Sequence, residues 1–193
     1  MSTDSSIIAR SLTQPTLFGE LFHRHAPRIH RYVARRAGDR IADDVTSETF
    51  LIAFEKRERF DRSHEDASPW LLGIATNVIH RHRIAEARNL RAIERGVEEA
   101  ATSGGIDATS QAIDAEAEVR RLAGELRKMR ATDRDCLLLY AWEDLSYDQI
   151  AVAMQIPVGT VRSRLNRARR ILRAAPRTKE GSHERVIYTP DPA

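Results

Sequence analysis

Hydrophobic residues along this chain recur at spacings of three and four residues, which place them on one face of a helix. They do so in two separate stretches. In the first, the pattern predicts helices over about residues 17–36 and 40–56, and a third helix that starts near Ser68. In the second, it predicts helices on both sides of Pro157. Neither stretch shows the alternation that is typical of a half-buried strand. We therefore expect an all-α protein.

The two helical stretches are separated by a segment without a core-forming pattern. Small residues occupy its centre, 100–105, and residues 94–118 contain seven acidic residues and one basic residue. This composition favours a flexible linker. The polar C-terminal end is expected to be disordered, with a short docking segment as the alternative. The expected organisation is an N-terminal extension (1–15), a first helical domain (16–91), an acidic flexible linker (92–117), a second helical domain (118–173) and a C-terminal tail (174–193).

The second domain ends in two helices joined by a tight turn. Ser146 and Gln149 have the spacing of a capping box, which predicts the start of the first of these helices. Pro157 ends that helix, because proline cannot continue the hydrogen-bond ladder. The helix that follows carries an apolar stripe made of Val161, Leu165, Ala168 and Leu172. This pattern is typical of a helix-turn-helix, whose second helix enters the major groove of DNA.

The charge of this last helix indicates a polyanionic partner. Residues 158–173 contain six arginines and no acidic residue, although like charges four residues apart weaken a helix. DNA phosphates would offset that repulsion. The alternative is an ordinary solvated basic helix, and the net charge of +3 for the whole chain does not decide between the two.

The composition and the motifs that the sequence lacks argue against a disulfide-bonded protein, a membrane protein and an enzyme. Cys136 is the single cysteine, so no disulfide can form within the chain, and we expect a small buried hydrophobic residue in reducing surroundings. The sequence shows neither a signal peptide nor a stretch of membrane-spanning length, which predicts a cytoplasmic protein without membrane insertion. A P-loop, a G-x-S-x-G motif and a Cys/His set with zinc spacing are also missing. We therefore expect no catalysis, no cofactor and no metal site.

Residues 132–173 resemble the C-terminal DNA-binding domain (region 4) of sigma-70 family RNA polymerase initiation factors, in the extracytoplasmic-function (ECF) group. In that family this domain binds the −35 promoter element. Arginine pairs well with guanine edges and asparagine with adenine, so the residue types suit base readout. The resemblance implies that the bases are faced by Arg162, Ser163, Asn166 and Arg167. It places nearer the phosphates Thr160, Arg164 and Arg169.

Residues 18–91 resemble the other conserved ECF domain (region 2), which binds core polymerase and opens the −10 element. The run ADDVTSETFLIAFEKRERF at residues 42–60 is similar to the segment that packs on the clamp of the largest polymerase subunit. From the residues alone, an ordinary acidic helix face is the alternative. The core-binding residues that the resemblance implies are Asp43, Asp44, Val45, Glu48, Phe50 and Leu51.

The same resemblance assigns −10 recognition to the loop at residues 61–67 and to the helix after it. Trp70, Asn77 and Arg81 lie close to one line on that helix, and an aromatic and an amide beside arginines suit the holding of unpaired bases. Core packing of Trp70 is the alternative. The −10 residues implied are Asp61, Arg62, Ser63, Trp70, Asn77, His80, Arg81 and Arg83.

The order of the two domains predicts a sigma factor that binds core RNA polymerase, at its clamp and flap, and directs promoter-specific initiation. It would recognise the −35 and −10 elements and help to melt the −10 element. The resemblance also implies external control, often by an anti-sigma protein. The alternative function is a free-standing helix-turn-helix regulator, which would need an effector pocket or a dimer helix. Neither is visible in the sequence.

Overall fold

The computed structural model describes residues 2–96 and 123–174, and every regular element within them is helical, as expected. The linker expected at 92–117 lies outside the described residues from 97 onward, and so does the expected tail from 175 onward. Residues 123–128 are also helical. The α-helices are α1 (Asp4–Ser11), α2 (Phe18–Ala37), α3 (Ala42–Glu55), α4 (Ser68–Gly96), α6 (Ala131–Glu143), α7 (Tyr147–Met154) and α8 (Val158–Ala174). Short 3-10 segments are Pro15–Leu17, Asp39–Ile41 and Arg57–Arg59.

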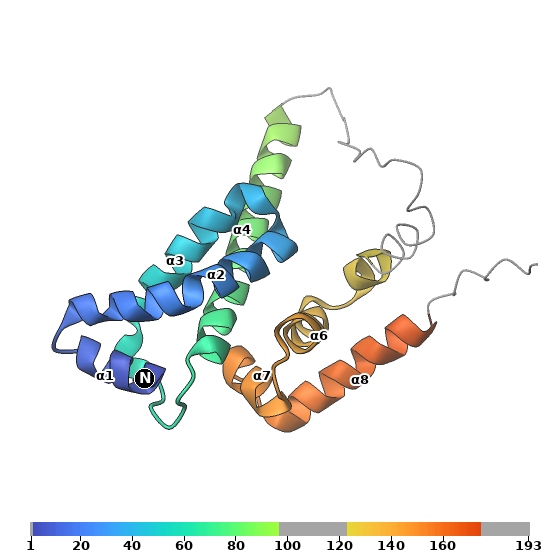
Figure 1. Cartoon of the computed structure of the whole chain (residues 1–193). Helices are drawn as coiled ribbons and strands as arrows, with labels where there is room; N and C mark the ends of the chain where they lie inside the picture. The colour runs from blue at the N-terminus through green and yellow to red at the C-terminus, as the bar shows by residue number, and fades with distance from the viewer. Residues whose placement is uncertain (1, 97–122, 175–193) are drawn as a thin grey trace, which may run out of the picture.

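Helices α2, α3 and α4 pack on one another and form the first domain (Figure 1). The turn between α2 and α3 needs Gly38, whose φ of 87° is a conformation that side chains with a Cβ rarely adopt. The core of this domain is apolar, and Leu21, Ile29, Val33 and Leu71 are fully buried in it. Burial of these stripes is the main source of helix stability in the domain.

Helix α1 packs on the same core, whereas the sequence predicts residues 1–15 to be an extension that precedes the first domain. Ile7 and Ile8 are fully buried. The carboxylate of Asp4 accepts hydrogen bonds from the backbone N–H of Ala67 at 2.8 Å and from Arg24 at 2.5 Å, and it contacts His25 at 2.7 Å. These contacts tie the start of the chain to α2 and to the loop that precedes α4.

The second domain consists of α6, α7 and α8, and its start signals are those that the sequence predicts. The capping box at α7 is present with both hydrogen bonds, from Gln149 N–H to Ser146 Oγ at 3.2 Å and from Ser146 N–H to Gln149 Oε1 at 2.9 Å. Helix α7 ends at Met154 and is capped by Gln155 in the left-handed conformation, two residues before Pro157. In α8 the stripe residues Val161, Leu165 and Ala168 are fully buried.

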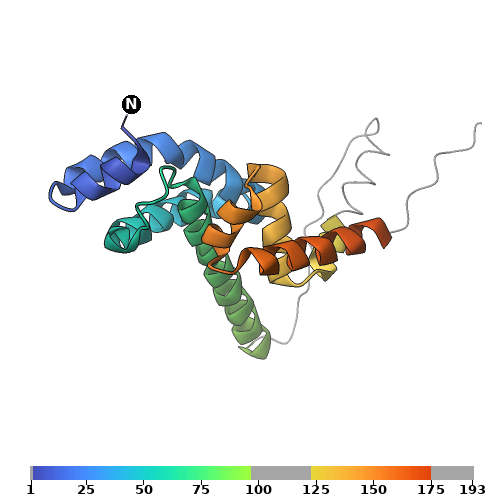
Figure 2. The same cartoon turned by 90° about the horizontal axis from the view of Figure 1, so that it is seen from below.

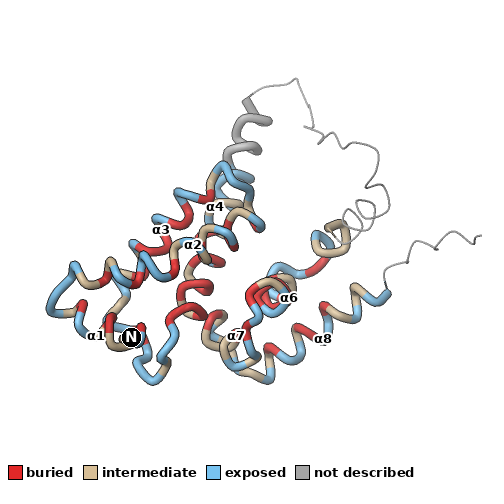
Figure 3. The backbone as a smooth tube through the Cα atoms, viewed as in Figure 1, coloured by how far each residue is buried: buried red, intermediate tan, exposed pale blue. Residues whose placement is uncertain are grey.

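The two domains pack directly against each other, with α7 on the first half of α4 (Figures 1 and 2). The helices approach so closely at Gly73 that a Cβ there would lie 2.1 Å from the carbonyl oxygen of Ala153. The buried surfaces of both domains meet along this contact (Figure 3). Of the helices described, none is long and apolar enough to cross a membrane.

Ion pairs also join the domains. Arg36 at the end of α2 binds Asp135 of α6 at 2.5 Å, and both side chains are about 1% exposed. His80 of α4 contacts the other oxygen of the same carboxylate at 2.7 Å. Burial favours a higher pKa for Asp135, but the hydrogen bond with His80 and the charge of Arg36 outweigh it, and the pKa lies below its ordinary value. A second link runs from Arg28 to Glu143, at 2.8 Å.

Candidate nucleic-acid interface

Helix α8 presents an exposed polar and cationic face to solvent. Its buried stripe fixes the rotation of the helix, so that Arg162, Asn166 and Arg170 lie on one exposed line at steps of four. Ser163 is exposed beside them, and its hydroxyl donates to the carbonyl of Thr160 at 2.9 Å. Arg170 was not among the residues that the resemblance assigns to DNA, although its spacing from Arg162 and Asn166 could have identified it.

Three other arginines of α8 reach side chains of their own domain. Arg167 makes a two-pronged ion pair with Asp133, with both N–O distances at 3.1 Å, and this contact raises the pKa of Arg167. Arg169 donates to the hydroxyl of Tyr147 at 3.1 Å. Burial raises the pKa of the Cys136 thiol, and the nearby positive charge of Arg164 opposes that shift. Direct contact of Arg167 with a base would therefore require it to share or leave a buried carboxylate.

The residues expected to bind core polymerase divide between surface and core. Val45 and Phe50 are buried, and the Phe50 ring packs against Phe22 with centroids 4.9 Å apart. The other four reach the surface of α3: Asp43, Asp44, Glu48 and Leu51. Leu51 is 57% exposed, which is unusual for a leucine on a packed helix, and Phe22 is 40% exposed. Leu51 thus adds an apolar side chain to the acidic surface of α3.

A groove between α3 and α4 holds part of the set expected to bind the −10 element. Its volume is about 410 Å³. Asn77 and Arg81 line it from α4, together with Glu55 at the end of α3 and Lys56 just after it. Trp70 is half-buried one turn away from Ile74, and its ring lies 5.1 Å from that of Phe60. One side of the Trp70 ring therefore packs in the core, and part of the side chain stays accessible to solvent.

Arg81 also joins the two expected binding surfaces. It donates to Glu48 at 2.8 Å, and His82 contacts the other oxygen of that carboxylate at 3.0 Å. A residue assigned to DNA and a residue assigned to polymerase thus form one ion pair.

His80 and Arg83 lie on the other side of α4, toward the second domain. His80 contacts Asp135, and Arg83 donates to the backbone carbonyl of Arg36. Asp61, Arg62 and Ser63 are exposed in the loop before α4, as a base-capturing loop would need. The Asp61 carboxylate accepts the Ser63 N–H at 3.0 Å, which lowers the pKa of Asp61. The structure therefore brings Asn77 and Arg81 together in one groove and places His80 and Arg83 elsewhere.

One cluster in the described part of the chain has the spacing of metal ligands. Atoms of Asp4, His25 and Asp66 lie within 4.8 Å of one another. Their partners are already provided by the protein, because Asp4 accepts from Ala67 and contacts His25, and Asp66 accepts the N–H of Ser68 at 2.8 Å. The Ser68 hydroxyl, at the start of α4, lies 3.3 Å from the His25 ring. This arrangement explains the cluster as a structural anchor for α1.

Two family models match the chain in the order that the sequence suggested. Residues 21–89 match sigma-70 region 2, and residues 120–172 match sigma-70 region 4. The first match contains α3 and the groove at Asn77, and the second contains the helix-turn-helix of α7 and α8.

Named relatives agree with these matches. The ECF RNA polymerase sigma factor SigC of Mycobacterium tuberculosis is 36% identical over 147 residues, which cover 76% of each chain. The ECF sigma factor SigL of the same species is 32% identical over 164 residues, covering 83% of this chain and 89% of SigL.

Solved structures share the fold. CnrH, solved in complex with the cytosolic domain of CnrY, has a TM-score of 0.59 at 24% identity, covering 89% of this chain and 95% of CnrH. RpoE of Bartonella quintana, solved with the anti-sigma factor NepR, has a TM-score of 0.57 at 19% identity, covering 82% and 95%. With both domains matched in order and relatives above 30% identity across most of the chain, the protein belongs to the sigma-70 family of RNA polymerase sigma factors, in its ECF group.

Proposed function

We propose that this chain directs core RNA polymerase to its promoters by reading the −35 element with the exposed line of α8 and the −10 element with the groove between α3 and α4. The observation that carries the proposal is the acid-free exposed face of α8 at Arg162, Asn166 and Arg170, held in place by a buried stripe. Such a face can enter the major groove without burying an acidic group against phosphate.

We further propose that α3 docks on the polymerase through its exposed residues, Asp43, Asp44, Glu48 and Leu51. Val45 and Phe50 would act through the core by holding α3 in position. The loop at 61–67 and Trp70 would receive an unpaired base, whose unstacking costs a few kcal/mol and must be offset by stacking and phosphate contacts. The chain would act in the cytoplasm and would not catalyse a reaction itself. A separate inhibitor, an anti-sigma protein, would control its activity.

The double substitution Arg162→Ala with Asn166→Ala should abolish promoter-specific transcription. A good bidentate base contact is worth about 1–3 kcal/mol, so losing two should reduce run-off transcription by about 100-fold or more. The promoter is first identified by run-off transcription with core polymerase on a genomic fragment library. The double variant is then assayed on it.

The control for this experiment is Arg10→Ala, which removes an exposed arginine of α1 that lies outside both surfaces. It should leave transcription unchanged, and the double variant should still bind core polymerase. Full transcription by the double variant would contradict the assignment of α8. Tight, specific duplex binding without polymerase, and no polymerase-dependent start site, would favour the free-standing regulator instead.

Leu51→Asp should weaken binding to core polymerase by about tenfold or more, because it puts a charge into the apolar part of the proposed interface. The matched control is Ile84→Asp on α4, since Ile84 is 52% exposed and Leu51 is 57% exposed. Binding is measured with labelled sigma factor and purified core enzyme. Equal affinities for the two variants would show that α3 does not dock through Leu51.

A further inference from the structure

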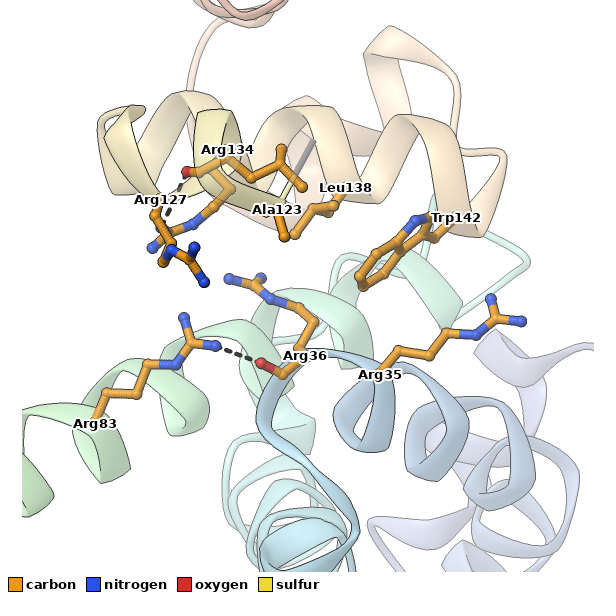
Figure 4. A pocket seen from close by; sticks show the side chains of 9 residues that line it. Arg35, Arg36, Arg83, Ala123, Arg127, Arg134, Leu138 and Trp142 are labelled. Carbon is orange, nitrogen blue, oxygen red and sulfur yellow. Dashed lines mark hydrogen bonds between the residues drawn. The ribbon is translucent and has the colours of Figure 1, made fainter. Parts of the chain in front are cut away.

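A cavity of about 740 Å³ lies where the two domains meet. The end of α2 and the middle of α4 form its first wall, and residues 123–128 and α6 form its second. Five arginines contribute to the lining: Arg35, Arg36, Arg83, Arg127 and Arg134. Figure 4 shows the guanidinium groups of Arg36, Arg83, Arg127 and Arg134 pointing toward one another at one end of this cavity.

Among the described residues, few acidic groups compensate the positive charge of this cluster. Asp135 is the one carboxylate that pairs with any of the five arginines in the described part of the chain, and it already serves Arg36 and His80. Arg83 donates to the backbone carbonyl of Arg36. Arg134 donates to the backbone carbonyl of Leu126 at 3.3 Å. Burial lowers the pKa of Arg83, and the charges of Arg36 and Arg134 lower it further. An anion in the cavity would relieve this repulsion.

One buried donor of the cluster also lacks a partner. The Nε of Arg134 is buried and has no hydrogen-bond acceptor among the residues that the structure describes. Leaving a buried donor unsatisfied is unfavourable, and most such groups in folded proteins have a protein, water or ligand partner. A bound anion would accept this hydrogen bond.

The other end of the cavity is apolar and aromatic. Trp142 lies there beside Arg35 (Figure 4). Leu126, Leu138 and Ala123 add apolar surface. A volume of this size falls in the range that holds small-molecule ligands, about 300–1,000 Å³. The lining therefore suits an elongated ligand that is anionic at one end and planar or apolar at the other.

We propose that this cavity binds a nucleoside polyphosphate, with the phosphates among Arg83, Arg127 and Arg134 and the base against Trp142. Guanidinium groups bind phosphate oxygens through paired N–H donors, which a cluster of lysines could not do with the same geometry. An indole ring can stack on any of the nucleobases, because each of them has a flat π-face. The ligand would contact both domains at once, so its binding would favour their packed arrangement.

The full-length protein is titrated by calorimetry with ATP, GTP, adenosine and inorganic pyrophosphate. We expect ATP or GTP to bind at least about tenfold more tightly than adenosine or pyrophosphate, because the two nucleotides use both ends of the cavity. Arg127→Gln should weaken nucleotide and pyrophosphate binding about tenfold, the effect of losing a charged hydrogen bond. Trp142→Leu should weaken nucleotide binding and leave pyrophosphate binding unchanged.

Arg127 is a suitable probe because it is exposed, so its substitution does not unfold the domain. Arg59→Gln is the matched control, since Arg59 is an exposed arginine away from the cavity, and it should bind nucleotide as the parent protein does. The proposal is overturned if neither nucleotide binds at millimolar concentration, or if Arg127→Gln binds as tightly as Arg59→Gln. Binding of a polyglutamate peptide in place of nucleotide would likewise overturn it, and would assign the cavity to a protein partner.

Discussion

Asp4→Ala is expected to lower the free energy of unfolding of the first domain by about 2–3 kcal/mol, because each buried hydrogen-bonding group left without a partner costs about 1–3 kcal/mol. Asp4 is 3% exposed, and its carboxylate is the shared acceptor for Ala67 N–H and Arg24 and the partner of His25. Removing it leaves a buried backbone N–H and a buried imidazole unsatisfied. The expected loss is measured by urea denaturation of the full chain, followed by circular dichroism.

The control for Asp4 is Asp43→Ala, because the side chain of Asp43 is 93% exposed and has only a surface contact, with His30 at 3.2 Å, among the described residues. It should change stability by less than about 1 kcal/mol.

Burial favours a higher pKa for Asp4, but the His25 contact and the Ala67 N–H outweigh it, and the pKa lies below its ordinary value. The stabilisation by Asp4 is therefore present at neutral pH and is lost as the pH falls through this lowered pKa. A loss as small as that of Asp43→Ala at pH 7 would show that Asp4 does not anchor α1.

Gly73→Ala should separate the two domains while leaving each one folded. The new Cβ would lie 2.1 Å from the carbonyl oxygen and 2.9 Å from the carbonyl carbon of Ala153. Both atoms belong to the backbone of α7, so no side-chain rotation can relieve the overlap. Within an isolated helix, alanine is favoured over glycine by about 1 kcal/mol. Any loss of compactness must therefore come from the contact between α4 and α7.

Small-angle X-ray scattering of the full chain measures this effect as an increase in the radius of gyration. The matched control is Gly19→Ala, also a glycine within a helix, whose added Cβ would meet nothing within 4 Å. It should leave the radius unchanged and stabilise the protein slightly. An unchanged radius for Gly73→Ala, with normal far-UV circular dichroism, would mean that the domains do not pack through these helices.

The helices of both domains could be predicted from the sequence because their stability comes from continuous apolar stripes. The stripe of α8 and the capping box at Ser146 are local patterns. The structure confirms the capping box and buries three residues of the stripe, while Leu172 is half-buried. Helix α1 could not be found in this way. It has eight residues and a single adjacent pair of large apolar side chains, Ile7 and Ile8. Its stabilisation depends on partners such as His25 and Ala67, which are distant in sequence.

The packing of the two domains against each other could not be predicted from the sequence either. The contact uses a glycine against a backbone carbonyl at Gly73, and an ion pair between Arg36 and Asp135, which are 99 positions apart. None of these residues carries a local signal. For the same reason, the sequence could not show that the residues expected to bind the −10 element lie in two places. Asn77 lines the groove between α3 and α4, whereas His80 contacts Asp135 of α6 at the domain junction.

The first helix has a practical consequence for anyone who shortens this protein. Besides Asp4 and Ala67, its contacts with the loop at 61–67 include Ser5 Oγ to the Arg62 carbonyl at 2.9 Å and Asp4 N–H to the Glu65 carbonyl at 3.0 Å. The matched region 2 begins at residue 21 and leaves these anchors out. A fragment cut at that family boundary would keep its signature motifs yet release the loop at 61–67, which we propose receives the unpaired base, so a failure of that fragment to melt DNA would be an artefact of the cut.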